Sequence, residues 1–223
     1  MKSNEKVIYL LSGMGADDRA YYLMDFKEEK IVHIKWIKPL KSDSLSDYAI
    51  KLAEQIDFTK KVILIGTSLG GMLAVEIAKK FNIEKTILIS TVKTSSEMPP
   101  QLNLFRIFPL QKLIPGRVIV ALRNILRPII FKGRVNKKAH DLFTGMLKDT
   151  DPDFLIWSMN AALGWKNYTI PENIIHYHGD KDLVFPIRYQ KSKFVTINGG
   201  THVMLITKAK ILSELIVEEI KNT

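Results

Sequence analysis

The chain has 223 residues, of which 46% are hydrophobic and 25% charged, and its 33 Lys and Arg against 23 Asp and Glu give a formal net charge of +10. This length and composition fit one globular domain and exclude disordered, collagen-like and low-complexity classes. The chain contains no cysteine, which excludes disulfides, thiolate metal sites and a cysteine nucleophile, so serine, histidine and carboxylate side chains must carry any chemistry.

Short apolar runs alternate with amphipathic stretches through the first 92 residues. Strands are predicted over 6–12, 31–37, 61–66 and 85–91, a short helix or loop over 17–26, and helices over 44–56 and 69–81. The runs Val62–Ile65 and Ile87–Ile89 lack polar alternation, which is typical of strands that helices cover on both faces. This pattern predicts an α/β fold with a mostly parallel sheet.

The alternation breaks between residues 93 and 168, where prolines are frequent and no strand is predicted. Strands are again predicted over 173–177 and 193–197, and a closing amphipathic helix over 208–221. The sequence therefore predicts about six strands, with helices on both faces of the sheet and a long insertion after the fourth strand. The core is expected to comprise residues 1–92 and 169–223, and a helical cap residues 93–168.

The apolar runs are too short for a membrane or a secretory signal. None approaches the roughly 18 residues of a membrane-spanning helix. The run Val7–Leu11, near the first residue, is shorter than the ~7 to 15 residues that a signal peptide requires. A cytoplasmic location is therefore the default expectation.

A Gly-x-Ser-x-Gly motif, Gly66–Gly70, stands where a predicted strand ends and a predicted helix begins. A serine on so sharp a turn has a strained backbone, which exposes its hydroxyl at the carboxyl edge of the sheet. The free amides at the start of the helix favour negative charge nearby. Taken alone, the motif fits an ordinary strand-to-helix turn about equally well.

Two later loops offer partners for Ser68. Asp180 and Asp182 follow the fifth predicted strand, and His202 follows the sixth, so all three lie at the same sheet edge as Ser68. A serine hydroxyl needs a base that a carboxylate orients, and the order Ser68, Asp182, His202 is the one expected for such a hydrolase site. Asp180 is the alternative acid, although it is expected to bond amides of its own loop.

The first predicted strand runs directly into the flexible segment Ser12–Gly15 at the same edge. The Met14 amide there, together with the Leu69 amide, predicts an oxyanion hole, because two donors are needed to stabilise a tetrahedral intermediate. An ordinary glycine turn is the alternative interpretation of this segment.

These motifs resemble those of the α/β-hydrolase superfamily, and more narrowly of its small bacterial esterase-like members. The resemblance covers residues 6–92 and 172–221 and rests on residues 66–72, on 178–182 with Val184 and Pro186, and on 199–202. It implies that Ser68 is the nucleophile, His202 the general base and Asp182 the orienting acid in cleavage of an ester or thioester through an acyl-enzyme, with no cofactor. The first two strands usual in the family are expected to be absent, because the first predicted strand here already leads into the oxyanion segment.

The insertion leaves the sheet at the edge that bears Ser68. It is therefore expected to fold over the predicted site as a cap. Several of its apolar side chains are candidates for a substrate pocket, although each one singly is more often a packing residue. The candidates are Leu142, Phe143, Met146, Leu147, Phe154, Ile156, Trp157, Met159 and Trp165. Of these, Met146, Trp157 and Trp165 are the pocket residues that we predict.

Most of the net charge lies in the insertion. Residues 93–148 contain 11 basic and two acidic residues, and residues 117–127 predict a basic amphipathic helix. Such a helix is compatible with weak contact with an anionic membrane or with attraction of an anionic substrate, whereas a solvated surface is the simpler interpretation. Nucleic acid is not an expected partner, because the basic residues lie among aliphatic rather than stacking aromatic side chains.

Two other classes of function compete with a small-molecule esterase. A dinucleotide site is excluded because Asp18 stands where the third glycine of that motif would be, and the histidine spacing does not indicate a metal site. A non-catalytic ligand-binding or signalling protein on a hydrolase scaffold, membrane-associated through the basic cap, stays open, because a fold alone does not fix function.

Overall fold

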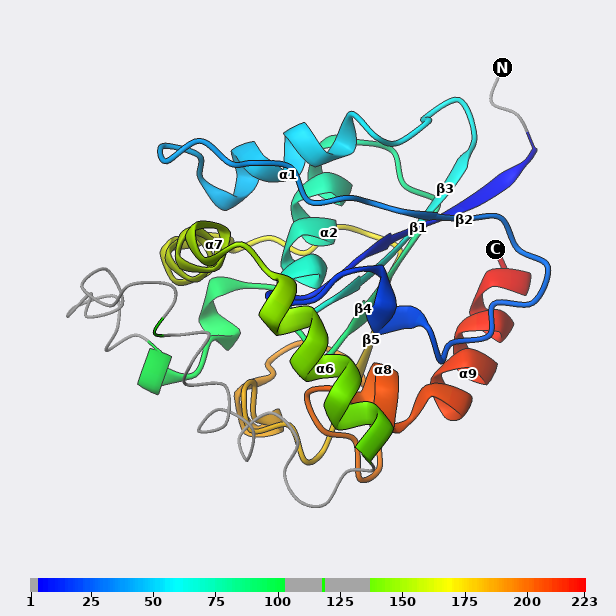
Figure 1. Ribbon diagram of the computed structural model, residues 1–223. Helices are drawn as coiled ribbons and strands as arrows, with labels where there is room; N and C mark the ends of the chain where they lie inside the picture. Colours follow the sequence, from blue (N-terminus) through cyan, green and yellow to red (C-terminus); the bar gives the residue numbers. More distant parts are fainter. Residues whose placement is uncertain (1–3, 103–117, 119–136) are drawn as a thin grey trace.

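A six-stranded sheet runs through the centre of the molecule (Figure 1). The computed structural model describes residues 4–102, 118 and 137–223. The strands are β1 (Lys6–Leu11), β2 (Ile31–His33), β3 (Lys61–Thr67), β4 (Lys85–Ile89), β5 (Ile174–Gly179) and β6 (Val195–Ile197). They lie in the order β2-β1-β3-β4-β5-β6, and every pair of neighbours is parallel. The predicted parallel α/β sheet of six strands is thus confirmed.

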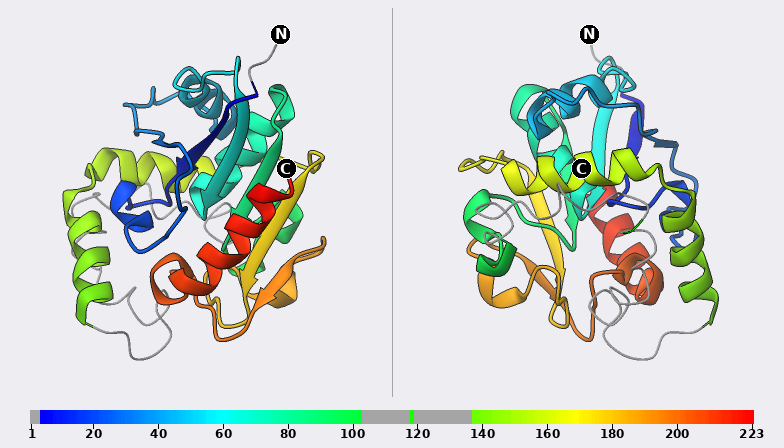
Figure 2. Two further views of the ribbon diagram at one scale, coloured as in Figure 1. Left: turned by 90° about the vertical axis from the view of Figure 1, so that its right-hand side faces the viewer. Right: turned by 60° about the vertical axis from the view of Figure 1, so that its left-hand side comes forward.

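Helices cover both faces of this sheet (Figure 2). They are α1 (Leu45–Ala53), α2 (Leu69–Lys80), α6 (Lys137–Asp149), α7 (Pro152–Gly164), α8 (Met204–Thr207) and α9 (Ala209–Lys221), with 3-10 turns η1 (Asp18–Tyr21), η2 (Ser95–Glu97) and η4 (Ile187–Tyr189). On one face α1, α2 and α7 pack against residues such as Val62 and Leu64. On the other, η1, α6, α8 and α9 pack against residues such as Ile63 and Ile65. Successive strand residues point to opposite faces, so continuous apolar runs supply both cores.

Local sequence signals set the starts of two of these helices. The Ser44 hydroxyl accepts the Asp47 N–H (3.1 Å) while the Asp47 carboxylate accepts the Ser44 N–H (3.0 Å), which forms a capping box at α1. At α7, the Asp151 carboxylate accepts the Asp153 N–H (2.7 Å), and Pro152 occupies the first helical position.

The second strand is shorter than predicted, because it ends at His33 and does not continue to Ile37. Beyond its end, the backbone bonds to side chains of α1 and of the turn that follows it. The Lys35 N–H donates to the Gln55 side chain (2.9 Å), and the Ile37 N–H donates to the Tyr48 hydroxyl (3.2 Å). The alternating pattern therefore belongs to a segment that runs along α1 rather than to the sheet.

The described chain between β4 and β5 contains two helices that pack differently. Phe154 and Trp157 of α7 contact Tyr48 of α1, so α7 belongs to the layer of α1 and α2. In contrast, α6 lies on the opposite side, next to η1, where Met146 joins the second core (Figure 1). The division of the chain at residues 93 and 168 stays a prediction. The predicted basic helix over residues 117–127 lies outside the described residues, apart from Val118.

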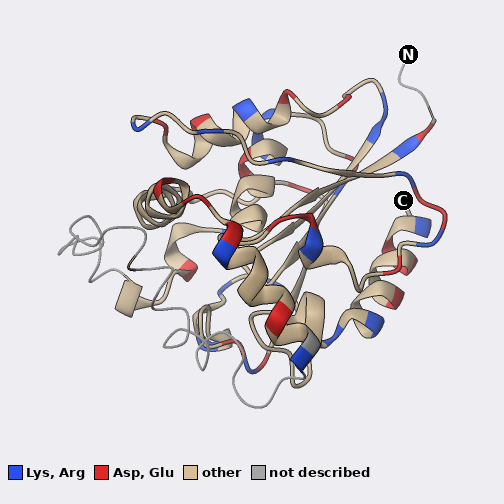
Figure 3. Cartoon of the chain, viewed as in Figure 1, with Lys and Arg blue, Asp and Glu red and all other residues tan. Residues whose placement is uncertain are grey.

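Charged residues are scarce within the sheet (Figure 3). Lys6, Lys61 and Lys85 each occupy the first position of a strand, at the end away from the predicted site. Within the described ranges, no helix is both long enough and apolar enough to cross a membrane.

Candidate active site

Ser68 occupies the turn between β3 and α2 with φ 52° and ψ −120°, a conformation that residues with a side chain rarely adopt. The turn is held from the end of β4. The Ser68 N–H donates to the Ile89 carbonyl oxygen (3.1 Å), and the Thr91 hydroxyl donates to the Ser68 carbonyl oxygen (2.6 Å). These bonds fix a strained backbone that presents the serine hydroxyl at the carboxyl edge of the sheet.

The glycines two residues before and after Ser68 allow close backbone approach. A Cβ at Gly66 would lie 2.4 Å from the Gly70 carbonyl oxygen, and a Cβ at Gly70 would lie 2.3 Å from the Leu11 carbonyl oxygen. Both distances are far below van der Waals contact, so neither position accepts a side chain without movement of the backbone. The spacing of the motif thus follows from how tightly the turn packs on itself and on β1.

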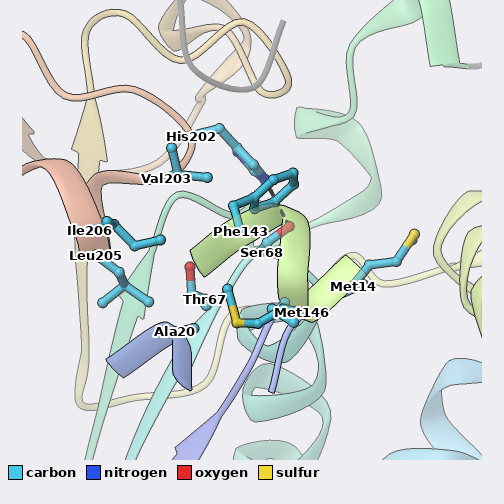
Figure 4. Close-up of a pocket in the computed structure, with 12 residues that line it drawn as sticks. Met14, Ala20, Thr67, Ser68, Phe143, Met146, His202, Val203, Leu205 and Ile206 are labelled. Atoms are coloured by element: carbon cyan, nitrogen blue, oxygen red, sulfur yellow. Dashed lines mark hydrogen bonds between the residues drawn. The ribbon is translucent and has the colours of Figure 1, made fainter. Parts of the chain in front are cut away.

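His202 bridges Ser68 and Asp182 across the sheet edge. Its Nδ1 lies 2.9 Å from Asp182 Oδ2. Its Nε2 lies 3.0 Å from Ser68 Oγ (Figure 4). Because an ionised carboxylate only accepts hydrogen bonds, we assign the proton of the neutral ring to Nδ1, which leaves Nε2 to accept the serine proton. The geometry is that of a nucleophile next to a base which a third group orients.

Asp182 is held in a buried, hydrogen-bonded position. Its Oδ1 accepts the N–H groups of Val184 (2.8 Å) and Phe185 (2.9 Å), which leaves Oδ2 for His202. Burial alone raises the pKa of the Asp182 carboxyl, but its interactions with His202 and the Phe185 N–H outweigh burial, and the net pKa lies below its ordinary value. The carboxylate is therefore ionised at neutral pH.

Asp180, the alternative acid, lies apart from this array. Its Oδ1 accepts the Gly199 N–H (2.6 Å), and the Lys181 ammonium lies 3.3 Å from its Oδ2. It therefore ties the loop after β5 to the loop after β6. The structure brings Asp182, and not Asp180, against His202.

The backbone of Met14 and Leu69 borders the serine. Gly13 packs so closely that a Cβ there would lie 3.3 Å from Ser68 Cβ. Leu69 is the first residue of α2, where an N–H has no acceptor within its own helix. Among the described residues, neither the Met14 nor the Leu69 N–H has an acceptor. Both amides therefore remain candidates for the oxyanion hole that the sequence predicts.

A pocket of about 60 Å³ opens beside Ser68 and His202 (Figure 4). It is lined by Gly13, Met14, Ala16, Ala20, Thr67, Ser68, Phe143, Met146, His202, Val203, Leu205 and Ile206. The walls come from the loop after β1, from η1, from α6 and from the segment through α8, and most of their side chains are apolar. A single water needs about 10 to 15 Å³, so the pocket is large enough to admit a small group.

Of the three predicted pocket residues, Met146 lines the pocket, whereas Trp157 and Trp165 do not. The Trp157 Nε1–H donates to the Asp43 carbonyl oxygen (3.3 Å). The Trp165 Nε1–H donates to the Glu76 carboxylate (2.8 Å) in the core under α2. Both lie away from this pocket because Trp157 lies on α7 and Trp165 directly follows it, and α7 packs on α1 and α2.

Several lining residues were not predicted. Ala16 and Ala20 follow the glycine segment after β1, and Val203, Leu205 and Ile206 follow His202 directly. Their closeness in sequence to the two motif loops is the signal that would have identified them.

Two contacts hold α6 at the wall of the pocket. The Arg19 guanidinium donates to Asp17 (2.6 Å) and to Asp149 at the end of α6 (2.8 Å). A Cβ on Gly15, whose φ is +72°, would lie 2.7 Å from Leu147 Cδ1 of α6. The helix therefore packs directly on the segment that contains Met14.

The arrangement combines a hydroxyl, a base, an orienting carboxylate and two amides without an acceptor in the described chain. These are the groups that nucleophilic attack on a carbonyl carbon requires. In the part of the chain that the structure describes, no group of three or more His, Cys, Asp or Glu side chains is placed to hold a metal ion.

Comparison with known proteins agrees with this fold. Residues 7–214 match a family described as the alpha/beta hydrolase family, and no curated protein matches the chain. MenH from S. aureus has a TM-score of 0.79 at 15% identity, over 99% of this chain and 95% of that one. A hydrolase from Oleispira antarctica has a TM-score of 0.73 at 17% identity, over 100% and 93%. The esterase EaEST from Exiguobacterium antarcticum has a TM-score of 0.73 at 17% identity, over 99% and 93%.

Proposed function

The chain belongs to the alpha/beta hydrolase family, and on that premise we propose that it is a serine hydrolase that cleaves a carboxylic ester or thioester through an acyl-enzyme on Ser68. The observation that carries the proposal is the unbroken series of two hydrogen bonds, 2.9 Å and 3.0 Å, from Asp182 through His202 to Ser68. The similar solved structures include an esterase, which supports the same class of reaction.

In the proposed mechanism, Ser68 Oγ attacks the carbonyl carbon while His202 Nε2 takes the hydroxyl proton. The Met14 and Leu69 amides donate to the oxyanion, and Asp182 stabilises the imidazolium. Collapse breaks the bond to the leaving oxygen or sulfur, which receives the proton from His202. A water molecule then gives a proton to His202 and attacks the acyl-enzyme, and the carboxylic acid leaves as Ser68 regains its hydrogen.

The pocket favours substrates with one small, uncharged group next to the scissile bond. Its volume of about 60 Å³ fits a short chain, and apart from His202 the described residues that line it carry no ionisable side chain. Burying an unpaired charge among apolar walls is costly, so a charged substituent at this position is disfavoured. Esters of short acyl chains are therefore the substrates that we propose first.

Hydrolysis of p-nitrophenyl acetate, butyrate and octanoate tests the proposal. We expect wild-type protein to prefer the two shorter esters, and Ser68→Ala to lower kcat by roughly 10⁵-fold or more, as loss of a serine nucleophile does elsewhere. Ser96→Ala is the matched control, because Ser96 is exposed after β4 and should leave the rate unchanged. Full activity in Ser68→Ala would overturn the proposal.

The same assay separates the non-catalytic alternative. Folded wild-type protein that cleaves neither esters nor thioesters, yet binds a small apolar ligand, would instead support a ligand-binding role. Acyl transfer is distinguished from hydrolysis by adding an alcohol or thiol acceptor, because transfer forms a new ester or thioester in place of the free acid.

A further inference from the structure

Two buried histidines stand behind Asp182 and take no part in the proposed reaction. His176 and His178 are two residues apart on β5, so their side chains lie on the same face of the sheet, where they are 2% and 0% exposed. His178 Nδ1 lies 3.1 Å from His176 Nε2, and His178 Nε2 lies 2.7 Å from the Phe185 carbonyl oxygen. Both rings therefore belong to one hydrogen-bonded path that ends in the loop after β5.

The direction of this path follows from the acceptor at its end. A carbonyl oxygen only accepts, so His178 Nε2 carries a proton and donates to Phe185. Burial lowers the pKa of both imidazoles, and a neutral His178 has Nδ1 free as an acceptor. His176 must then donate from Nε2, which leaves its Nδ1 unprotonated, in agreement with the lack of a partner for that atom among the described residues.

The charged groups around the pair are engaged elsewhere. The Lys93 ammonium donates to the Lys193 carbonyl oxygen (2.7 Å), and the Glu97 carboxylate accepts the Ser192 N–H (3.1 Å). Asp182 Oδ2 lies 3.8 Å from His178 Nε2, which is too far for a hydrogen bond, and His202 bonds to that same Oδ2. His178 thus does not bond directly to the carboxylate that orients His202.

Phe185 connects His178 to Asp182 and His202. Its carbonyl oxygen accepts the His178 Nε2–H, and its N–H donates to Asp182 Oδ1 (2.9 Å). Its ring meets the imidazole of His202 edge to face, with centroids 5.5 Å apart and planes at 68°. One residue therefore receives a bond from His178 and contacts both the acid and the base of the site.

We propose that His178 is a positioning residue of the active site, which fixes the backbone of Phe185 through its Nε2–H and thereby sets the place of Asp182 and His202. His176 fixes the tautomer that makes this possible. The inference rests on the proposed function, since it assigns a role within the same site. It implies that the orientation of the base depends on a group that never touches the substrate.

A pair of amide substitutions separates the two bonds of His178. The amide of His178→Gln reaches about as far as Nε2 and keeps a donor for Phe185, whereas that of His178→Asn reaches only as far as Nδ1 and loses it. We expect His178→Asn to lower kcat for p-nitrophenyl butyrate by roughly 10- to 100-fold, as loss of a residue that orients a functional side chain does at metal centres, with KM within about twofold. His178→Gln is expected to restore most of this loss.

Phe194→Leu is the control for packing. The Phe194 ring meets both imidazoles, 6.3 Å from His176 and 6.1 Å from His178, but it makes no hydrogen bond. This variant should lower stability and leave kcat within about twofold of wild type, because it removes area and no donor. An equal fall in kcat for Phe194→Leu and His178→Asn would overturn the positioning role.

Nitrogen-15 NMR of the wild-type imidazoles tests the inference without any activity and without a variant that must fold. At pH 7 we expect His178 and His176 to be neutral and protonated at Nε2, and His202 to show a downfield Nδ1–H signal. A His178 that is protonated at Nδ1 alone would overturn the inference. Wild-type protein with these tautomers but without esterase activity would support the hydrogen-bonded path and overturn the proposed hydrolysis.

Discussion

The loops at the carboxyl edge of the sheet and the helices between β4 and β5 are built on different principles. In the loops, the backbone places the functional groups: Ser68 has φ 52°, Gly66 and Gly70 permit close contact, and two amides hold Asp182. In the helices, a side chain faces the pocket only if the helix that carries it packs there, as Met146 of α6 does. Chemistry is thus determined by short-range geometry, and the shape of the pocket by packing.

Of the substitutions that test this contrast, the one with the largest expected effect lies within a single loop. Asp182→Asn removes the acceptor for His202 Nδ1–H, and a carboxamide there stabilises the wrong imidazole tautomer, so kcat should fall by roughly 10⁴-fold. Asp180→Asn, two residues earlier, should change kcat by less than about tenfold. Steady-state kinetics with p-nitrophenyl butyrate measures both, and equal losses would remove the distinction between the two carboxylates.

Met146→Ala tests the helical side of the comparison. The substitution removes a buried side chain that also forms the pocket wall, so the free energy of unfolding should fall by about 2 to 5 kcal/mol. The ratio of kcat/KM for octanoate to that for acetate should rise by roughly tenfold or more, because the pocket lengthens. An unchanged ratio in folded protein would show that α6 does not limit the substrate.

Trp165→Phe is the counterpart in the core. It deletes the Nε1–H that donates to the buried Glu76 carboxylate, which keeps its ion pair with Lys79 at 2.9 Å. Urea denaturation should show a loss of about 1 to 3 kcal/mol, while the octanoate to acetate ratio stays at the wild-type value. A change in that ratio would instead indicate that Trp165 limits the length of the substrate.

The last expected effect is a pH dependence of stability. Burial lowers the pKa of His176 and His178 in the folded protein, so below about pH 6.5 the unfolded chain binds more protons than the folded one, and stability falls as pH falls. The slope is at most about 1.4 kcal/mol per pH unit for each proton. The urea midpoint should therefore fall between pH 7 and pH 5, and less steeply in His176→Leu. Identical slopes in both proteins would exclude His176 as a cause.

Much of the sheet and of the site was predictable because both depend on local pattern. The all-apolar runs of β3 and β4 indicated strands covered on both faces, and the glycine spacing around Ser68 reflected a turn that excludes side chains at Gly66 and Gly70. Parallel strands end at one edge, which is why Asp182 and His202 could be placed beside Ser68 although they are more than a hundred residues away in the chain.

The pocket and the extent of the second strand were less predictable, because both depend on tertiary neighbours. Trp157 and Trp165 are as apolar and aromatic as a pocket residue should be, and only the packing of α7 on α1 directs them into the core. The residues after His33 alternate like a strand. The N–H groups of Lys35 and Ile37, however, bond to the side chains of Gln55 and Tyr48 and not to a neighbouring strand. Neither contact leaves a signal in the local sequence.

The central claim is that the hydroxyl of Ser68 is the attacking group. Reaction with a fluorophosphonate, followed by mass spectrometry of the digested protein, tests it most directly, because such a probe marks only a serine that a neighbouring base activates. We predict one adduct per chain, on the peptide that contains Ser68, and none in His202→Ala. Folded wild-type protein that stays unlabelled, or that is labelled at another serine, would contradict the claim.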